Sequence, residues 1–345
     1  MTIDMHAHWR PQALADAMRK RTTPPRIVKS PKGQDLLDNG TQQIPIDGLF
    51  DDMDERLRSM DRYGISTAVL SLFGQLQWIE RLPAQEALPL CRAYNDALSD
   101  ICQAHPGRFA GYASLPLADM EIAANEFARA MSLTGVIGAI LPGNAFLTLD
   151  AAKQYEPLMQ VANDHKAMIF IHWNPRPGDA WPRVSRDIEG GNPRLGTIDM
   201  QSSLSSNMVT LCWTDYLDRF PNATVHIHNL GGNLPFEVER MDHRRYMDTP
   251  DQPLPSQRVR KPNLYVDCNS FGAKAIELGV DLYGADKIMF ATDGTDFSTE
   301  WSNKAIAEAR LDASQRRQIL HENAQRIIGH LTQLAPTVEH RAAAE

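Results

Sequence analysis

Short apolar runs alternate along the chain with longer amphipathic segments. Several of these runs are almost continuously apolar, which is typical of parallel strands covered by helices rather than of half-exposed antiparallel strands. There are eight such runs, in residues 3–6, 67–73, 109–115, 136–141, 168–173, 224–228, 264–268 and 287–292. The pattern therefore predicts eight mainly buried strands.

The segments between the runs have the periodicity of helices. In residues 50–64, apolar side chains recur every three or four positions up to Gly64, which is a typical helix stop. Similar patterns precede three further strands, in residues 85–107, 120–135 and 149–166. A βα unit repeated eight times predicts an α/β fold, the (β/α)₈ or TIM barrel.

Two stretches interrupt this alternation. Residues 22–48 and 174–206 are irregular and rich in Pro and Gly, and loops of this length in a compact domain are usually lids or binding loops. We therefore expect one barrel domain over residues 1–331 with insert loops at about 22–48 and 174–206. Residues 332–345 are expected to form a tail without chemistry.

Charge and composition narrow the class of protein. A formal net charge of -8 over 345 residues gives no basic field for nucleic acid or for an anionic membrane surface. The four cysteines lie far apart without C-x-x-C spacing, which argues against a disulfide framework and suits a reducing compartment. No export signal and no membrane-spanning apolar window is visible, so we expect a cytoplasmic protein without nucleic-acid or membrane partners.

The strand ends carry the candidate chemistry. A barrel gathers the carboxyl ends of its strands around one mouth, and four of these ends bear histidine or aspartate. His6 and His8 are two residues apart, so they share one face of the first strand. Three histidines and one carboxylate at one mouth would suit zinc or a similar divalent metal. The residues are His6 and His8, His172, His226 and His228, and Asp293.

The last two histidines leave an alternative open. His226 and His228 lie on the same face of their strand, so alternation alone does not decide which of them approaches the metal. His228 precedes a Gly-Gly turn that lets the backbone come close to a ligand, and its imidazole suits proton transfer near neutral pH. Asp293 can act as a ligand or as a base, and Asp296 is a rival carboxylate that more often would cap a turn.

Substrate contacts are expected close to these strand ends. Trp173 ends the fifth predicted strand and Asn174 follows it, and an aromatic pocket could also involve Trp9 and Trp181. Arg240 belongs to a cationic cluster that follows the Gly-Gly turn, and it could reach an anionic substrate or a neighbouring subunit.

The ordered motifs resemble a known family. The segments IDMHAH, IHWNP, HNLGG, PFEVERM, ATDG and ILHENAQRIIG are similar to those of the amidohydrolase-related metal-dependent decarboxylases. That group includes 2-amino-3-carboxymuconate-6-semialdehyde decarboxylase and the γ-resorcylate and 5-carboxyvanillate decarboxylases. The resemblance extends over essentially the whole chain and implies an amidohydrolase-type barrel with long βα loops.

The resemblance also implies roles for single residues. His6, His8, His172 and Asp293 would hold one divalent metal, with zinc expected first and manganese as the other candidate. His228 would be the catalytic histidine. Arg240 would bind the substrate carboxylate from the partner subunit, which implies a homodimer or a higher homo-oligomer.

Three departures from the family pattern bear on the substrate. TDGTDFS replaces Thr-Asp-x-Pro-Phe, HNLGG replaces His-Gly-Gly-Gly, and QQIPIDGLFDD lacks an arginine that the muconate-semialdehyde enzyme carries. The expected activity is decarboxylation of an aromatic or dienoic carboxylic acid. The alternatives are a metal-dependent hydrolase or hydratase acting on an aromatic-degradation intermediate, and a barrel that binds a ligand without turning it over.

Overall fold

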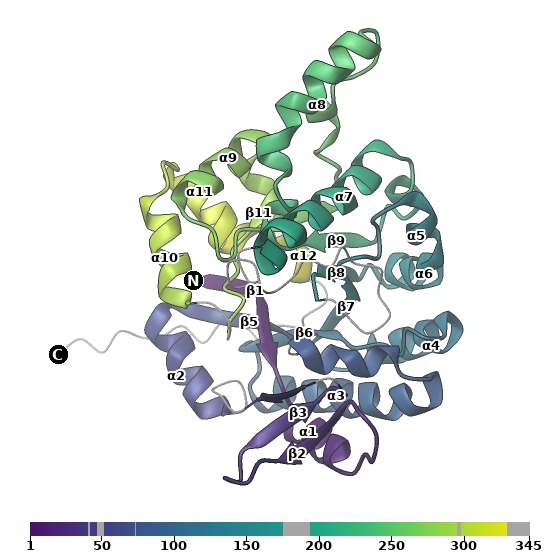
Figure 1. The fold of residues 1–345 in the computed structure, drawn as a ribbon. Coiled ribbons are helices and arrows are strands. Elements are labelled where there is room, and N and C mark those ends of the chain that lie inside the picture. The colour runs from purple at the N-terminus through teal and green to yellow at the C-terminus, as the bar shows by residue number, and fades with distance from the viewer. Residues whose placement is uncertain (41, 47–51, 73, 175–193, 295–297, 330–345) are drawn as a thin grey trace, which may run out of the picture.

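Eight parallel strands form the centre of the protein in a computed structural model (Figure 1). The structure describes residues 1–40, 42–46, 52–72, 74–174, 194–294 and 298–329. The strands pair in chain order, and all eight predicted runs are strands. They are β1 (Thr2–Trp9), β5 (Ile65–Leu72), β6 (Phe109–Ala113), β7 (Val136–Pro142), β8 (Met168–His172), β9 (Thr224–Ile227), β10 (Leu264–Asp267) and β11 (Ile288–Met289).

The sheet closes on itself between its first and last strands. The backbone N–H of Met5 donates to the carbonyl of Phe290 (3.0 Å), and Ala7 forms a parallel bridge with Gly294. This closure makes the sheet a barrel and confirms the predicted fold class. β1 is longer than the predicted 3–6 and runs through both histidines, which places them within the barrel wall.

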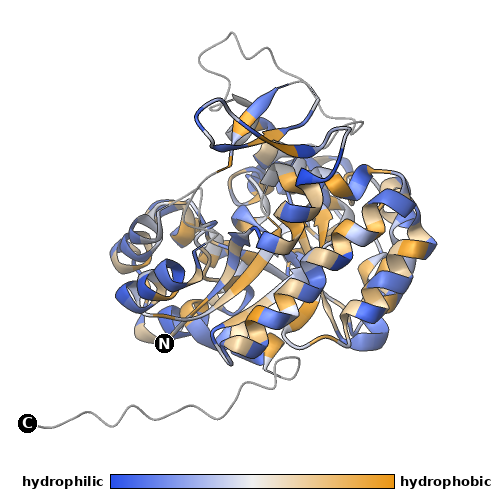
Figure 2. Cartoon of the chain, turned by 90° about the horizontal axis from the view of Figure 1, so that it is seen from below, coloured by the Kyte–Doolittle hydropathy of each residue, from blue (hydrophilic) through white to orange (hydrophobic). Residues whose placement is uncertain are grey.

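Helices surround the barrel and bury their apolar faces against it. Hydrophobic residues follow the strands and the inner helix faces, whereas the outer faces are hydrophilic (Figure 2). The helices are α1 (Gln12–Arg19), α2 (Met53–Tyr63), α3 (Ala84–Ala104), α4 (Met120–Ala130), α5 (Leu149–Gln154), α6 (Glu156–His165), α7 (Met200–Trp213), α8 (Leu234–Asp248), α9 (Ala273–Tyr283), α10 (Thr299–Glu308), α11 (Ala313–Arg317) and α12 (Asn323–Ile328).

The ends of α2 show how local sequence sets helix bounds. The Asp52 carboxylate accepts a hydrogen bond from the backbone N–H of Glu55, which satisfies a free donor of the first turn. Gly64 adopts a left-handed conformation (φ 70°) and ends the helix, as the sequence predicted. The helix therefore covers most of the predicted 50–64, and its first residue is Met53.

The prediction of an irregular loop over 22–48 was wrong for its described part. Three short strands form an antiparallel sheet there, β2 (Arg26–Lys29), β3 (Asp35–Asp38) and β4 (Gln43–Pro45). The strands are three or four residues long, so their alternation is too brief to stand out in a Pro- and Gly-rich sequence. This small sheet lies at the opposite end of the molecule from α8 in Figure 1.

The prediction of a loop over 174–206 was also wrong in part. Residues 194–199 form a π-helical segment that leads into α7, so the second half of the stretch is helical. Residues 175–193 and the predicted tail, 332–345, lie outside the described residues. Among the helices that the structure describes, none is both long and apolar enough to cross a membrane.

Candidate metal centre

Four side chains converge at the carboxyl ends of the barrel strands. His6 and His8 come from β1, His172 ends β8, and Asp293 follows β11. One potential ligand atom from each side chain lies within 4.8 Å of those of the other three, and all four residues are buried. The structure therefore brings together the four residues that the sequence singled out as metal ligands.

The three imidazoles meet edge to edge. Their ring centroids are 4.8 to 5.0 Å apart, and each pair of ring planes is within a few degrees of perpendicular. The Nε2 atoms of His6 and His8 are only 3.3 Å apart. This arrangement places nitrogen lone pairs around a common point, as ligands of a single ion require.

Asp293 completes the cluster from the other end of the chain. Its Oδ1 lies 3.3 Å from His6 Nε2 and 3.0 Å from His8 Nε2. Burial alone would raise the pKa of this carboxyl, but the charges of His6 and His8 and a hydrogen bond from His8 outweigh burial and lower the pKa to about 2. Asp293 is therefore a carboxylate at neutral pH.

Both β1 histidines are oriented by partners on their outer nitrogens. Ser71 Oγ lies 2.9 Å from Nδ1 of His8, and Asp267 Oδ2 lies 3.5 Å from Nδ1 of His6. A metal-ligating histidine typically uses its second nitrogen in this way, because the contact fixes the tautomer and the ring orientation.

The donor set fits one divalent cation. Three imidazole nitrogens and one carboxylate oxygen suit zinc, manganese and similar first-row ions, and such a set does not select one of them. A cation would also compensate the buried carboxylate of Asp293, whose Oδ1 lies close to the Nε2 atoms of His6 and His8.

His226 is not part of the cluster, so the alternative that made it a ligand was wrong. Its Nε2 lies 2.8 Å from Asp267 Oδ2, and its Nδ1 lies 3.2 Å from the hydroxyl of Tyr112. Both ring nitrogens therefore have protein partners. Burial lowers the pKa of His226, so the ring is neutral at neutral pH.

His228 lies against the metal cluster. Its ring stacks on His172 with centroids 4.9 Å apart, and its Nε2 accepts a hydrogen bond from the backbone N–H of Trp173 (3.0 Å). Burial, reinforced by the nearby His6, lowers the pKa of His228 to about 3. A neutral ring that accepts at Nε2 carries its proton at Nδ1, and Nδ1 is buried without a hydrogen-bond partner among the described residues.

The turn after His228 has an unusual backbone. Asn229 and Leu230 both have φ of 53°, and Gly231 and Gly232 continue with φ of 65° and 83°. A left-handed leucine is strained, and such strain persists only where the surroundings hold it. A Cβ at position 232 would lie only 2.2 Å from the carbonyl oxygen of Gln201. Because glycine has no Cβ, Gly232 lets the turn pack closely against α7.

The predicted substrate residues lie in different places. Trp173 is half-buried beside His228, and the Asn174 amide donates to the carbonyl of Gly74 (2.5 Å). Trp9 packs in the core with its ring centroid 6.3 Å from that of Tyr94. Trp181 and Asp296 lie outside the described residues.

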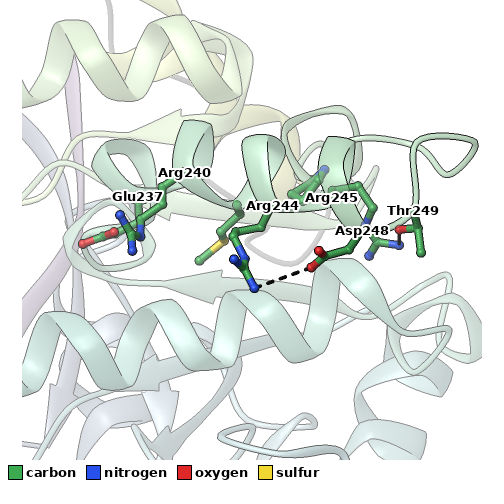
Figure 3. Close-up of a pocket in the computed structure, with 8 residues that line it drawn as sticks. Glu237, Arg240, Arg244, Arg245, Asp248 and Thr249 are labelled. Carbon is green, nitrogen blue, oxygen red and sulfur yellow. Dashed lines mark hydrogen bonds and ion pairs between the residues drawn. The ribbon is translucent and has the colours of Figure 1, made fainter.

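Arg240 is exposed on α8 and is not one of the four clustered residues. It lines a cavity of about 520 Å³ on this helix (Figure 3), and the helix projects beyond its neighbours in Figure 1. Arg244 and Arg245 lie on the same helix, and an ion pair joins Arg244 to Asp248 (3.7 Å).

The sequence analysis did not identify four residues that contact the proposed ligands or their neighbours. Each lies on a barrel strand or just after one, and they are Ser71, Tyr112, Asp267 and Asn269. Asp267 ends an apolar run, LYVD, as Asp293 follows another, so the same signal could have identified it. Ser71 and Tyr112 lie inside apolar runs and gave no such signal.

A parallel barrel with this donor set at its mouth defines a metal-dependent enzyme of the TIM-barrel class. The Amidohydrolase family model matches residues 3–329, and the chain belongs to the amidohydrolase family.

Relatives of known activity match most of the chain. Gamma-resorcylate decarboxylase of Polaromonas sp. is 29% identical over 305 residues, which cover 81% of this chain and 88% of that protein. The expected resemblance to this group of decarboxylases is thereby confirmed.

Solved structures show the same fold. The 2,6-dihydroxybenzoate decarboxylase from Rhizobium superposes with a TM-score of 0.73 at 21% identity, over 95% of this chain and 98% of that one. The dihydroxybenzoic acid decarboxylase from Polaromonas sp. JS666, with bound manganese and the inhibitor 2-nitroresorcinol, has a TM-score of 0.71 at 23% identity, over 95% and 96% of the two chains.

Proposed function

We propose that this protein is a metal-dependent carboxy-lyase that removes carbon dioxide from an aromatic or dienoic carboxylic acid, of which a hydroxybenzoate is the first candidate. The observation that carries the proposal is the position of His228. A neutral imidazole with an unpartnered Nδ1–H, among the described residues, lies directly against a three-histidine, one-aspartate cluster. The decarboxylase relatives of the same family support the reaction class.

One divalent ion is proposed at His6, His8, His172 and Asp293. Zinc and manganese both suit these ligands, and the manganese of the Polaromonas neighbour supports the second. When bound, the ion would supply Lewis-acid stabilisation of negative charge and would orient the substrate oxygens.

His228 and Asp293 are the groups proposed to handle protons. His228 holds a proton at Nδ1 and can donate it to a substrate oxygen, while Asp293 holds negative charge at its carboxylate and can accept and return a proton. In the reaction, a proton is added to the carbon that bears the carboxylate. The carbon–carbon bond then breaks, its electron pair returns to the ring or diene, and carbon dioxide leaves.

Trp173 and Asn174 are proposed to border the substrate. Both follow His172 directly, and the backbone of Trp173 holds His228. The Asn174 amide contacts the segment Gly74–Arg81, so it connects the end of β8 to the loop after β5.

Arg240 is proposed to serve a neighbouring subunit. It is exposed on a projecting helix, and Phe236, Tyr246 and Met247 on the same helix are 78%, 68% and 61% exposed. Large apolar side chains at this exposure are typical of an interface. We therefore propose a homodimer or higher homo-oligomer in which α8 of one chain brings Arg240 to the substrate carboxylate of another.

The test is an assay with 2,6-dihydroxybenzoate and related hydroxybenzoates on protein loaded separately with zinc and with manganese, in ¹⁸O-labelled water. The proposal expects release of carbon dioxide, a product without added label, and no reaction after metal removal. Label in the product would instead support a hydrolase or hydratase. Tight binding of these acids without turnover would support a non-catalytic barrel.

A further inference from the structure

Asp267 lies behind the metal cluster and has no place in the function proposed so far. It ends β10 and is fully buried. Its Oδ2 contacts His226 Nε2 at 2.8 Å and His6 Nδ1 at 3.5 Å, and its Oδ1 accepts from the backbone N–H of Asn229 (2.9 Å) and from the Asn269 amide (2.8 Å).

The contacts of Asp267 determine where its neighbours carry their protons. Both oxygens of Asp267 face hydrogen-bond donors, namely the backbone N–H of Asn229 and the Asn269 amide at Oδ1 and His226 Nε2 at Oδ2. As a carboxylate, Asp267 only accepts, so His226 donates from Nε2. His226 Nδ1 is then free to accept from the Tyr112 hydroxyl (3.2 Å).

His6 Nδ1 lies 3.5 Å from Asp267 Oδ2 and 3.1 Å from the Asn269 amide nitrogen, which itself donates to Asp267 Oδ1. A proton on Nδ1 directed at Asp267 leaves the Nε2 lone pair directed at Asp293 and His8, which is the tautomer that a metal ligand needs. One carboxylate oxygen therefore favours the ligating form of His6, and His226 supports that oxygen from the other side.

The other oxygen of Asp267 holds the turn that carries His228. Its contact with the Asn229 backbone lies at the first of four left-handed residues, immediately after His228. The Tyr283 hydroxyl anchors the next residue by donating to the carbonyl of Leu230 (3.0 Å). A strained backbone persists only where such contacts hold it. One of the two contacts comes from Asp267, which also contacts the proposed metal ligand His6.

We propose that Asp267 is a positioning residue that fixes His6 in its metal-binding tautomer and, at the same time, fixes the turn that places His228. His226 and Tyr112 form the outer part of this network. The inference rests on the proposed metal centre, and it assigns no contact with substrate to Asp267.

Asp267→Asn tests this assignment, because it keeps the shape of the side chain and removes its charge. The affinity for cobalt(II) is measured by titration of the metal-free protein, and the visible spectrum of bound cobalt reports the ligand geometry. We expect affinity to fall by about 10- to 100-fold, which is typical for loss of such a partner, together with a changed spectrum.

Glu126→Gln is the matched control. Glu126 is also a buried carboxylate with charged and amide partners, Arg92, Arg129 and Asn95, and none of these is a proposed ligand. The control should lower the stability of the fold but leave cobalt affinity and the cobalt spectrum unchanged.

A second pair of variants covers the case in which Asp267→Asn does not fold. His226→Leu removes the donor to Asp267, whereas His226→Gln retains an amide N–H at a similar reach. We expect weaker cobalt binding in the leucine variant and recovery in the glutamine variant, with a smaller loss in Tyr112→Phe.

The outcomes separate this inference from the proposed function. Wild-type protein that binds no divalent metal would overturn both. A metal-binding wild type whose cobalt affinity and spectrum are unchanged in Asp267→Asn, or in His226→Leu if the first variant is unfolded, would overturn the inference and leave the proposed function standing.

Discussion

Asp293 and His6 meet through both backbone and side chain. The backbone N–H of Asp293 donates to the carbonyl of His6 (2.8 Å), and its carboxylate Oδ1 lies 3.3 Å from His6 Nε2. The first contact helps to close the barrel, and the second helps to complete the ligand cluster. Because they use different atoms, a side-chain substitution can remove the ligand and keep the closure.

Asp293→Asn should therefore lose metal without opening the barrel. Its amide keeps the shape of the side chain but lacks the charge that a divalent ion needs. We expect about one metal equivalent per wild-type chain by mass spectrometry, as a mononuclear site requires, and a reduction of about tenfold or more in the variant. Metal-stripped wild type is the control and should match the variant in thermal stability. Two equivalents in the wild type would contradict the mononuclear site.

Ser71→Ala should weaken metal binding through His8. The Ser71 hydroxyl lies 2.9 Å from His8 Nδ1, so its loss frees the ring to turn. We expect affinity to fall by about tenfold in a competition titration with a chelator. Ser66→Ala is the matched control, since Ser66 lies on the same strand and donates to the carbonyl of Thr2 instead. Equal effects of the two substitutions would show that His8 needs no such partner.

His228→Ala should separate turnover from metal binding. His228 is not one of the four clustered ligands, so the variant should retain metal and a folded barrel. Turnover should fall by about 10²- to 10⁴-fold, the usual range for loss of a proton-transfer group, in steady-state assays of carbon dioxide release. His165→Ala, at the exposed end of α6, provides a histidine control and should remain fully active. Persistent turnover in His228→Ala would remove this residue from the reaction.

Arg240 can be tested by mixing subunits. His228→Ala and Arg240→Ala should each be inactive or severely impaired alone. If Arg240 serves the neighbouring site, each mixed dimer regains one complete site, so equal random mixing restores about a quarter of wild-type activity. The measurement is turnover after the two variants have been dissociated and reassembled together. If Arg240 acts within its own chain, mixing restores nothing.

Glu126 should make the fold sensitive to acid. Burial would raise its pKa, but Arg129, Arg92 and Asn95 outweigh burial and lower the pKa below its ordinary value of 4.5. A depressed folded-state pKa contributes stability above pH 4.5, and this stability is lost as pH falls toward the folded-state pKa. Glu126→Gln should lower the free energy of unfolding at pH 7 by about 1–3 kcal/mol. Urea unfolding at several pH values should show this difference shrink below about pH 4.5, and a constant difference would contradict the assignment.

The barrel could be predicted because its strands are apolar and its helices are periodic. One geometric rule, that parallel strands deliver their carboxyl ends to one mouth, predicted a cluster of histidines and an aspartate there. The resemblance to the decarboxylase family then selected its four ligands, His6, His8, His172 and Asp293. Strand alternation placed His6 and His8 on a common face, and the structure shows their Nε2 atoms side by side.

The choice between His226 and His228 could not be made from alternation. β9 ends at Ile227, so His228 already belongs to the turn and the two histidines are not equivalent strand positions. His226 is held by Asp267 and Tyr112, which come from strands distant in sequence. Contacts of this kind depend on tertiary structure, and no local pattern reports them. The small sheet over Arg26–Pro45 was missed for a different reason, because its strands are too short to show a period.

The closure between β1 and β11 also has a consequence for biosynthesis. His6 leaves the ribosome well before Asp293, because nearly all of the barrel strands lie between them in the chain. The complete ligand set cannot form before Asp293 has been made, so the site can bind its ion only after all the barrel strands have been synthesised. Once bound, the ion would link β1 to the segment after β11 and so stabilise the closed barrel. The cellular metal supply would then influence the lifetime of the folded protein as well as its turnover rate.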